Sequence, residues 1–121
     1  MNKAIIAALF FTTFTVKAFC QTTIPAKEAA KHINETVTIC DKIADGRYFA
    51  NSQTTLLNVG NVHPNELLTL VIKGDDRKKF EQEPEKFFLN KKVCITGKII
   101  DFKGRPEIVI TEASQITLAK D

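Results

Sequence analysis

The feature that most constrains the fold is a pair of near-duplicate segments, residues 36–43 and 92–99, each of which carries one cysteine. If the segments are antiparallel strands with Cys40 opposite Cys94, one register accounts for the neighbouring positions as well. That register pairs Ile39 with Ile95, Thr38 with Thr96, and Val37 with Gly97. Strands that are distant in the sequence but paired in space predict a small closed β-barrel with a disulfide between them.

The two cysteines also bear on the chemistry of the chain. In an oxidising compartment, neighbouring cysteines form a structural bridge, and this is the interpretation we favour for Cys40 and Cys94. Two buried free thiols on adjacent strands would give the same sequence pattern and are the alternative. Metal binding is not indicated, because His32 and His63 are isolated and no Cys-x-x-Cys or His-x-x-x-His spacing occurs.

The first twenty residues have the pattern of an export signal. Lys3 supplies a positive start, and residues 4–16 form an uncharged run that is too short to span a bilayer. We therefore predict a signal peptide over residues 1–20 and a single domain over residues 21–121. The mature protein is expected in the periplasm or outside the cell, without a transmembrane segment.

Two cleavage sites fit the signal, one after Ala18 and one after Cys20, and neither fits it fully. Cys20 could alternatively carry a lipid anchor, but a lipoprotein signal has a small residue where this chain has Phe19. Lipidation at Cys20 is therefore the lesser alternative.

Removal of the signal leaves a nearly neutral domain. The chain has 17 Lys and Arg against 14 Asp and Glu, and two of the 17, Lys3 and Lys17, belong to the signal. The remaining 15 basic and 14 acidic residues give a net charge of +1. Binding to nucleic acid or to an anionic membrane would therefore depend on local patches and not on overall charge.

Turn residues and apolar alternation divide the domain into short strands and two helices. A short helix is expected after Pro25, and a second helix after Gly74, with an Asp cap, Phe80 facing inward and an interruption at Pro84. Loops are predicted at residues 45–52 and 103–106. The predicted strands cover residues 36–45, 53–60, 67–73, 92–99 and 107–111, with a final short segment at 116–118.

Three strands, a helix and two more strands, with the first strand paired to the fourth, is the layout of the oligonucleotide/oligosaccharide-binding (OB) fold. We predict an all-β domain with accessory helices: a five-stranded OB-fold Greek-key barrel. It has one helix between strands 3 and 4 and a short N-terminal helix.

The sequence also resembles a family of small exported bacterial OB-fold domains, over about residues 26–118. The family is usually described as nucleic-acid-binding and is similar to OB modules of secreted nucleases. The resemblance implies the same fold and a nucleic-acid ligand. It is carried by residues 57–60, Pro64, residues 71–72, residues 76–77, Phe80, Val93, residues 96–99, residues 104–109 and residues 114–116.

OB folds bind ligands on the outer surface of strands two and three, between the loops that join strands one to two and four to five. Basic residues there can contact phosphates, and aromatic faces can stack on bases. Tyr48 is the favoured stacking residue, because its polar tip tolerates exposure, whereas Phe49 and Phe102 are expected to plug the barrel ends. The ligand-binding residues that we predict are Arg47, Tyr48, Asn58, Lys73, Lys103 and Arg105, with Thr54 and Thr69 on the same surface.

A second basic group, Arg77 to Lys79 with Lys91 and Lys92, lies among acidic residues and is interpreted as a mixed-charge solvated face. Catalysis is also not favoured. Asp41, Asp45 and Asp101 could hold a metal in a nuclease, but carboxylates at strand ends are more often turn formers.

The sequence therefore predicts a noncatalytic OB-fold module without cofactor or metal. Its most favoured partner is single-stranded DNA or RNA. The alternative is an envelope accessory or stress protein of the same fold that binds a small anionic ligand or a protein.

Overall fold

The computed structural model describes residues 23–120 and places the two cysteine-bearing segments on adjacent antiparallel strands, β2 (Thr36–Phe49) and β5 (Lys92–Phe102). Cys40 lies opposite Cys94, and the two residues form a disulfide. The predicted register is confirmed, with Ile39 opposite Ile95, Thr38 opposite Thr96, and Val37 opposite Gly97. The predicted signal peptide, residues 1–20 with Cys20, lies outside the described residues.

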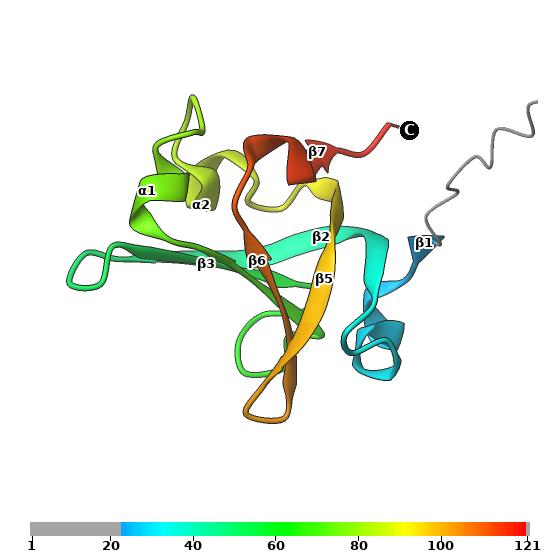
Figure 1. Ribbon diagram of the computed structural model, residues 1–121. Helices are drawn as coiled ribbons and strands as arrows, with labels where there is room; N and C mark the ends of the chain where they lie inside the picture. Colours follow the sequence, from blue (N-terminus) through cyan, green and yellow to red (C-terminus); the bar gives the residue numbers. More distant parts are fainter. Residues whose placement is uncertain (1–22, 121) are drawn as a thin grey trace, which may run out of the picture.

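Five strands close into a ring (Figure 1). The first half of β2 pairs with β5, and its second half pairs with β3 (Thr54–Val59). From there the ring continues through β4 (Leu68–Ile72) and β6 (Arg105–Ile110) back to β5. The β4–β6 contact is parallel and the other contacts of the ring are antiparallel, so the sheet closes on itself.

The described residues contain seven strands, where the sequence predicted five. Two short strands lie outside the ring: β1 (Thr23–Ile24) runs parallel to β2, and β7 (Ile116–Leu118) runs antiparallel to β5. Each of them pairs with an edge that the longer strand leaves free at that point. The final short segment predicted at residues 116–118 corresponds to β7, whereas β1 was not predicted, because a strand of two residues carries too little alternation to be recognised in a sequence.

The helices differ from the prediction in number and type. The N-terminal helix is a 3₁₀ helix, η1 (Ala26–Lys31), and the expected single helix after Gly74 is divided into α1 (Gly74–Arg77) and α2 (Pro84–Phe87). No Asp side chain caps α1. Pro84 begins α2, because its fixed φ suits a first helical position and its missing N–H is not needed there. A short 3₁₀ turn, η2 (Ala113–Gln115), precedes β7.

Strand β2 continues to Phe49, through part of the predicted loop at 45–52. A β-bulge between Ile43 and Asp45 bends the strand away from β5, and residues 46–49 then pair with β3. On the other side of the ring, the β5–β6 hairpin turns at Lys103 and Gly104, whose φ angles of 51° and 84° are both positive, as a two-residue hairpin turn requires.

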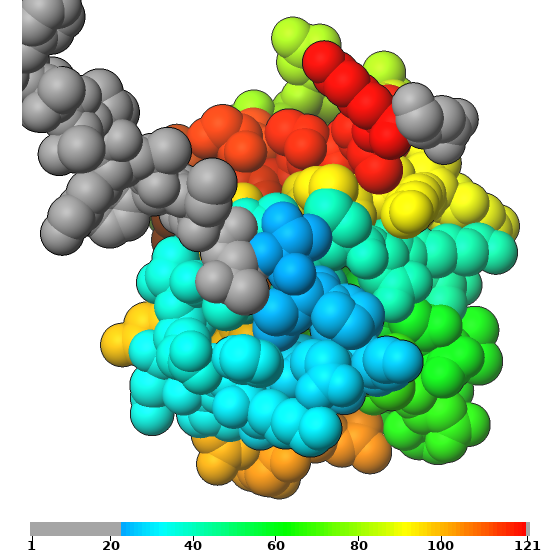
Figure 2. Space-filling view, turned by 90° about the vertical axis from the view of Figure 1, so that its right-hand side faces the viewer, coloured from blue at the N-terminus to red at the C-terminus, as the bar shows by residue number. Residues whose placement is uncertain are grey.

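The core fills the ring with aliphatic side chains that alternate inward along each strand. The N-terminal segment lies against β2, as Figure 2 shows for the blue and cyan parts of the chain, and it contributes Ala26 and Ala29 to the core. Gly97 lies where β5 passes over β6, and a Cβ there would come within 2.6 Å of Ile108 Cγ2, so only glycine fits without a shift. Within residues 23–120, no helix is long and apolar enough to cross a membrane.

Candidate nucleic-acid interface

A groove of about 670 Å³ crosses the outer face of the sheet between two hairpins. In Figure 1 the β5–β6 hairpin projects below the barrel, away from α1 and α2, whereas the β2–β3 hairpin projects to the left and lies below α1. All five strands of the ring contribute side chains to the groove, together with the β3–β4 loop. The lining residues are Asp45, Arg47, Phe49, Thr54, Leu56, Asn58, His63, Glu66, Thr69, Val71, Lys73, Ile100, Phe102, Arg105, Glu107 and Val109.

A polar row crosses the groove at right angles to the strands. Asp45 on β2 is in register with Asn58 on β3, Asn58 with Thr69 on β4, and Thr69 with Glu107 on β6. The Thr69 hydroxyl donates to Asn58 Oδ1 (3.2 Å), and Asn58 Nδ2 donates to Asp45 Oδ1. The second oxygen of Asp45 accepts the backbone N–H of His63 at 2.9 Å, which fixes the β3–β4 loop to the row.

An apolar row lies beside the polar one. Leu56 on β3 is in register with Val71 on β4, and Val71 with Val109 on β6, so three aliphatic side chains form a continuous floor. Arg47 is in register with Leu56 and ends this row at the β2 side. An apolar floor bordered by polar groups suits a flat ligand that buries one face and directs its edge to hydrogen-bonding side chains.

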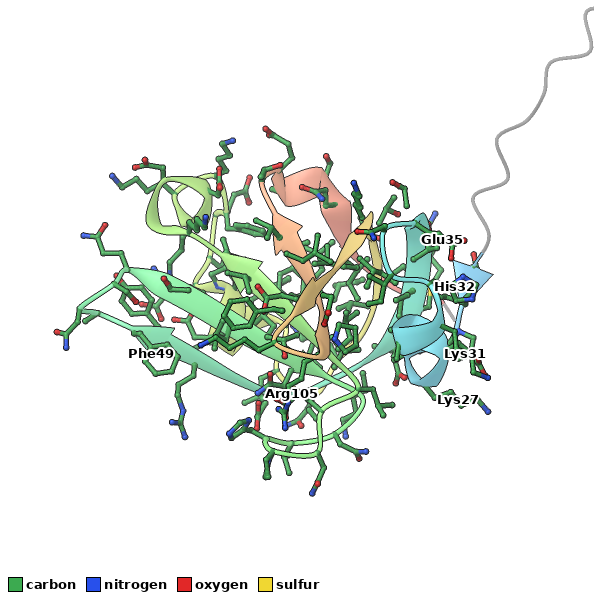
Figure 3. All side chains as sticks on the ribbon, turned by 60° about the horizontal axis from the view of Figure 1, so that its bottom comes forward. Lys27, Lys31, His32, Glu35, Phe49 and Arg105 are labelled. Atoms are coloured by element: carbon green, nitrogen blue, oxygen red, sulfur yellow. A yellow bond between two sulfur atoms is a disulfide. The ribbon has the colours of Figure 1, made fainter. Side chains whose placement is uncertain are left out.

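Phe49 and Phe102 border the groove and do not plug the barrel, so this prediction was wrong. Their exposed fractions are 40% and 51%. Strand β2 reaches Phe49 and β5 reaches Phe102, which places both rings beyond the core on the groove face of the hairpins. In Figure 3, Phe49 and Arg105 lie away from the polar residues near η1, namely Lys27, Lys31, His32 and Glu35. Two exposed rings are therefore available for stacking.

Tyr48 faces the other side of β2. Successive side chains of a strand point to opposite faces, and Tyr48 is adjacent to two groove residues, Arg47 and Phe49. Its ring packs under the Arg77 guanidinium, 4.1 Å from ring centroid to Cζ, beside a second hollow of about 280 Å³. The structure therefore does not bring Tyr48 together with the other predicted ligand residues.

The predicted cations divide into three groups. Arg47 and Lys73 line the groove, and their side chains make no hydrogen bond or ion pair within residues 23–120. Arg105 also lines it, but its guanidinium contacts Glu66 at 2.7 Å. Lys103 lies at the hairpin tip, with its ammonium 5.4 Å from the Phe102 ring centroid, and does not line the groove.

Glu66 connects the β3–β4 loop to the β5–β6 hairpin. Its side chain is only 6% exposed and accepts hydrogen bonds from Arg105 and from His63 Nδ1. Burial alone would raise the pKa of this carboxyl, but its own backbone N–H, the His63 hydrogen bond and the charges of His63 and Arg105 lower it overall. Glu66 is therefore held as a carboxylate that orients Arg105 over the groove.

Glu107 also lines the groove, and its carboxylate oxygens accept no hydrogen bond within the described residues. It is half-buried between Thr69 and Ile100, its register partners on the two neighbouring strands. Burial raises the pKa of Glu107, and the charge of Lys73 opposes that rise. Glu66 and Glu107 were both missed from the sequence, although the alternation of β6 through Arg105 and Glu107 was a signal for the second.

Four of the six predicted ligand residues meet in this groove: Arg47, Asn58, Lys73 and Arg105. Thr54 and Thr69, which we expected on the same surface, also line it. In the predicted mixed-charge solvated face, Lys78 pairs with Asp75, and Lys79 with Asp76 and Glu112, at the surface, whereas Arg77 and Glu85 form a largely buried pair that the prediction missed.

Asp41, Asp45 and Asp101, the carboxylates considered as metal ligands of a nuclease, do not form a cluster in the structure. Both oxygens of Asp45 already accept hydrogen bonds, and Asp101 lies in the β5–β6 ladder opposite Pro106. Asp41 lies in a different ladder, between β2 and β5, opposite Val93. In the described part of the chain, no group of three or more His, Cys, Asp or Glu side chains is placed to hold a metal.

No protein-family model and no curated protein matches this chain. Solved structures do resemble it in fold. A protein assigned as an aspartyl-tRNA synthetase from Leishmania major Friedlin superposes with a TM-score of 0.55 at 11% identity, over 86% of this chain and 22% of that one. The S. pombe Stn1-Ten1 complex gives a TM-score of 0.53 at 19% identity, over 71% of this chain and 59% of that one. At these identities the likeness concerns the fold alone.

Proposed function

We propose that this protein is a noncatalytic OB-fold binding module whose ligand is single-stranded nucleic acid. The OB assignment is supported by the five-strand ring, in which the first strand pairs with the second and the fourth, and the third runs parallel to the fifth. In such barrels, ligands lie on the face of strands two and three between two hairpin loops, and that is where the groove lies.

The observation that carries the proposal is the composition of the groove. Two exposed phenylalanine rings border an apolar floor, and two cations without an ion-pair partner among residues 23–120, Arg47 and Lys73, lie beside them. Aromatic rings stack on any base, and cations follow the phosphates, so this combination favours an unpaired strand over a duplex, whose bases are already stacked.

Because the groove contains both acidic and basic side chains, we expect stacking and base contacts to contribute more to affinity than phosphate contacts do. Asp45, Glu66 and Glu107 lie in the same groove as the cations, and Glu66 already neutralises Arg105. A small anionic ligand would gain little in such surroundings. The name of the aspartyl-tRNA synthetase refers to a nucleic acid, but it supports the proposal only through a shared fold, and a fold hosts many functions.

The protein is further proposed to act in the periplasm or outside the cell. The pattern of residues 1–20 supports export, and the Cys40–Cys94 disulfide is compatible with an oxidising compartment. No catalytic step is proposed.

The test is a titration of the purified protein with a fluorescent single-stranded 12-mer and with the matching duplex, at several salt concentrations. We expect the single strand to bind more tightly. The slope of log K against log salt should be about −1.4, because two free cations each release about 0.7 counterion on a single strand. Absence of single-strand binding at low salt would refute the proposal and favour a protein partner.

Two adjacent residues provide a matched pair for the same titration. Phe49→Ala removes a ring from the groove and should weaken binding about tenfold, within the range of one base stack. Tyr48→Ala removes a ring of the same exposed fraction from the opposite face and should change binding less than twofold.

A further inference from the structure

We infer that the groove selects among bases, and that Glu107 with Thr69 forms a site for the Watson–Crick edge of guanine. This inference rests on the proposed function and adds to it a preference that stacking and phosphate contacts do not provide. It comes from the direction of the hydrogen bonds along the polar row.

The polar row is closed at one end and open at the other. Thr69 donates to Asn58, and Asn58 donates to Asp45, so every donated bond runs toward β2. At the β2 end, the second oxygen of Asp45 is occupied by the His63 N–H. At the β6 end, the two carboxylate oxygens of Glu107 accept no hydrogen bond from residues 23–120.

The open end consists of acceptors. The Thr69 hydroxyl has used its proton toward Asn58 and retains lone pairs, and an ionised Glu107 can only accept. Lys73 is near enough to act on the Glu107 carboxylate through its charge, but the two form no ion pair. A group that contacts the two Glu107 oxygens must therefore present hydrogen-bond donors.

Among the bases, guanine presents two adjacent donors, N1–H and the 2-amino group, which match the two oxygens of one carboxylate. Adenine and cytosine place one amino group beside a ring acceptor, and thymine and uracil place one N–H between two carbonyl oxygens. A carboxylate at the base edge therefore favours guanine, and hypoxanthine, which keeps N1–H but lacks the amino group, should be intermediate.

The neighbouring ring is within reach of the same base. Ile100 is the register partner of Glu107, and Phe102 lies two residues farther along β5 on the same face. Diagonal neighbours of this kind are close enough for aromatic and long side chains to meet. A base stacked on Phe102 can thus direct its edge at Glu107.

The experiment uses five 9-mers of thymidine that differ only in the central base: guanine, hypoxanthine, adenine, cytosine or thymine. Binding to the purified protein is measured by fluorescence anisotropy. We expect the guanine 9-mer to bind about tenfold more tightly than the thymine 9-mer, as one bidentate contact allows, with hypoxanthine between them. Glu107→Gln, which exchanges one acceptor for a donor, should remove the preference for guanine over thymine.

Glu81→Gln is the matched control, because Glu81 is exposed and lies outside the groove, and it should retain the guanine preference. Equal binding of all five 9-mers, or a guanine preference that survives Glu107→Gln, would overturn the inference and leave the binding function intact. Failure of every 9-mer to bind would instead overturn the proposed function together with the inference. A thermal melt of each variant checks that it is folded.

Discussion

Tyr48 and Phe49 are neighbours on β2 and are both 40% exposed, but they belong to different surfaces. Tyr48 packs under Arg77, which also donates to the Thr55 hydroxyl at 3.0 Å and pairs with the Glu85 carboxylate. Phe49 borders a groove, and the groove cation on the same strand, Arg47, has no ion-pair partner within residues 23–120. On one face of the hairpin the neighbouring arginine is engaged by other side chains of the protein. On the other face the neighbouring arginine is available to a ligand.

The difference shows that exposure alone does not identify a binding residue. Both rings are equally accessible, and what distinguishes them is the occupation of the neighbouring charged groups. On the Tyr48 face, the Arg77 guanidinium is engaged by three partners, so it stabilises the contact between α1, α2 and the sheet. On the Phe49 face, the side chains of Arg47 and Lys73 have no ion-pair partner among residues 23–120 and remain available to a ligand.

Removal of the disulfide should have the largest effect on stability. It should affect both faces, because β2 carries both rings. Replacing Cys40 and Cys94 with serine should lower the free energy of unfolding by about 4 kcal/mol, as the chain-entropy model gives for a separation of 54 residues. Urea unfolding of the variant measures this, and the reduced wild-type protein should behave alike. A loss below about 1 kcal/mol would contradict the expectation.

Arg77→Ala should damage the Tyr48 face alone. It leaves the Glu85 carboxylate buried without its ion pair, and one Glu85 oxygen already lacks a hydrogen-bond partner, so the free energy of unfolding should fall by about 3 kcal/mol. Oligonucleotide affinity, measured where the variant is folded, should stay unchanged. Arg77→Met combined with Glu85→Leu should restore most of the stability. If that double variant failed to bind the oligonucleotide, the Tyr48 face would also be required for binding, and the separation of the two faces would be contradicted.

Arg47→Ala should act on the groove face alone, with a smaller effect. Loss of one phosphate contact should reduce the salt slope of single-strand binding by about 0.7, while the melting temperature stays nearly constant. Lys103→Ala is the control, since Lys103 lies outside the groove, and its slope should equal that of the wild type. Equal salt slopes for the two variants would mean that Arg47 does not contact a phosphate.

The smallest effect concerns the pH dependence at Glu66. A carboxyl whose pKa is lowered by folding stabilises the protein at pH values above its unfolded pKa, near 4.5, and this contribution is lost as the pH falls through the lower folded pKa. Glu66→Gln should therefore be less stable than the wild type at pH 7, and the two stabilities should approach each other in acid. Urea unfolding at pH 7 and pH 3 measures the difference, and a constant gap would contradict the assigned cause.

The duplicated segments made much of the barrel predictable, because the cysteine register fixed β2 against β5 before any other contact was known. Alternation also placed Thr54 and Asn58 on the outer face of β3. The bulge between Ile43 and Asp45 was not predictable, since it follows from the bend between two partner strands. The turn formers from Asp45 to Ser52 were therefore interpreted as a loop, although β2 extends to Phe49.

That error propagated to the site. Within a loop, neighbouring side chains have no fixed alternation, so Arg47 and Tyr48 were expected on one surface. On a strand they diverge, and Phe49 returns to the side of Arg47. The pairing of Arg105 with Glu66 could also not be predicted from the sequence, because it depends on the approach of the β3–β4 loop to the β5–β6 hairpin.

The most direct test of the central claim, that the ligand binds the groove face, is methyl NMR of the purified protein during titration with a single-stranded 12-mer. The methyl groups of Leu56, Val71 and Val109 form the groove floor and should shift progressively with added oligonucleotide. Leu89 and Leu118 are exposed outside the groove, at 41% and 46%, and should keep their positions. Shifts at Leu89 or Leu118 with an unchanged groove floor would contradict the account.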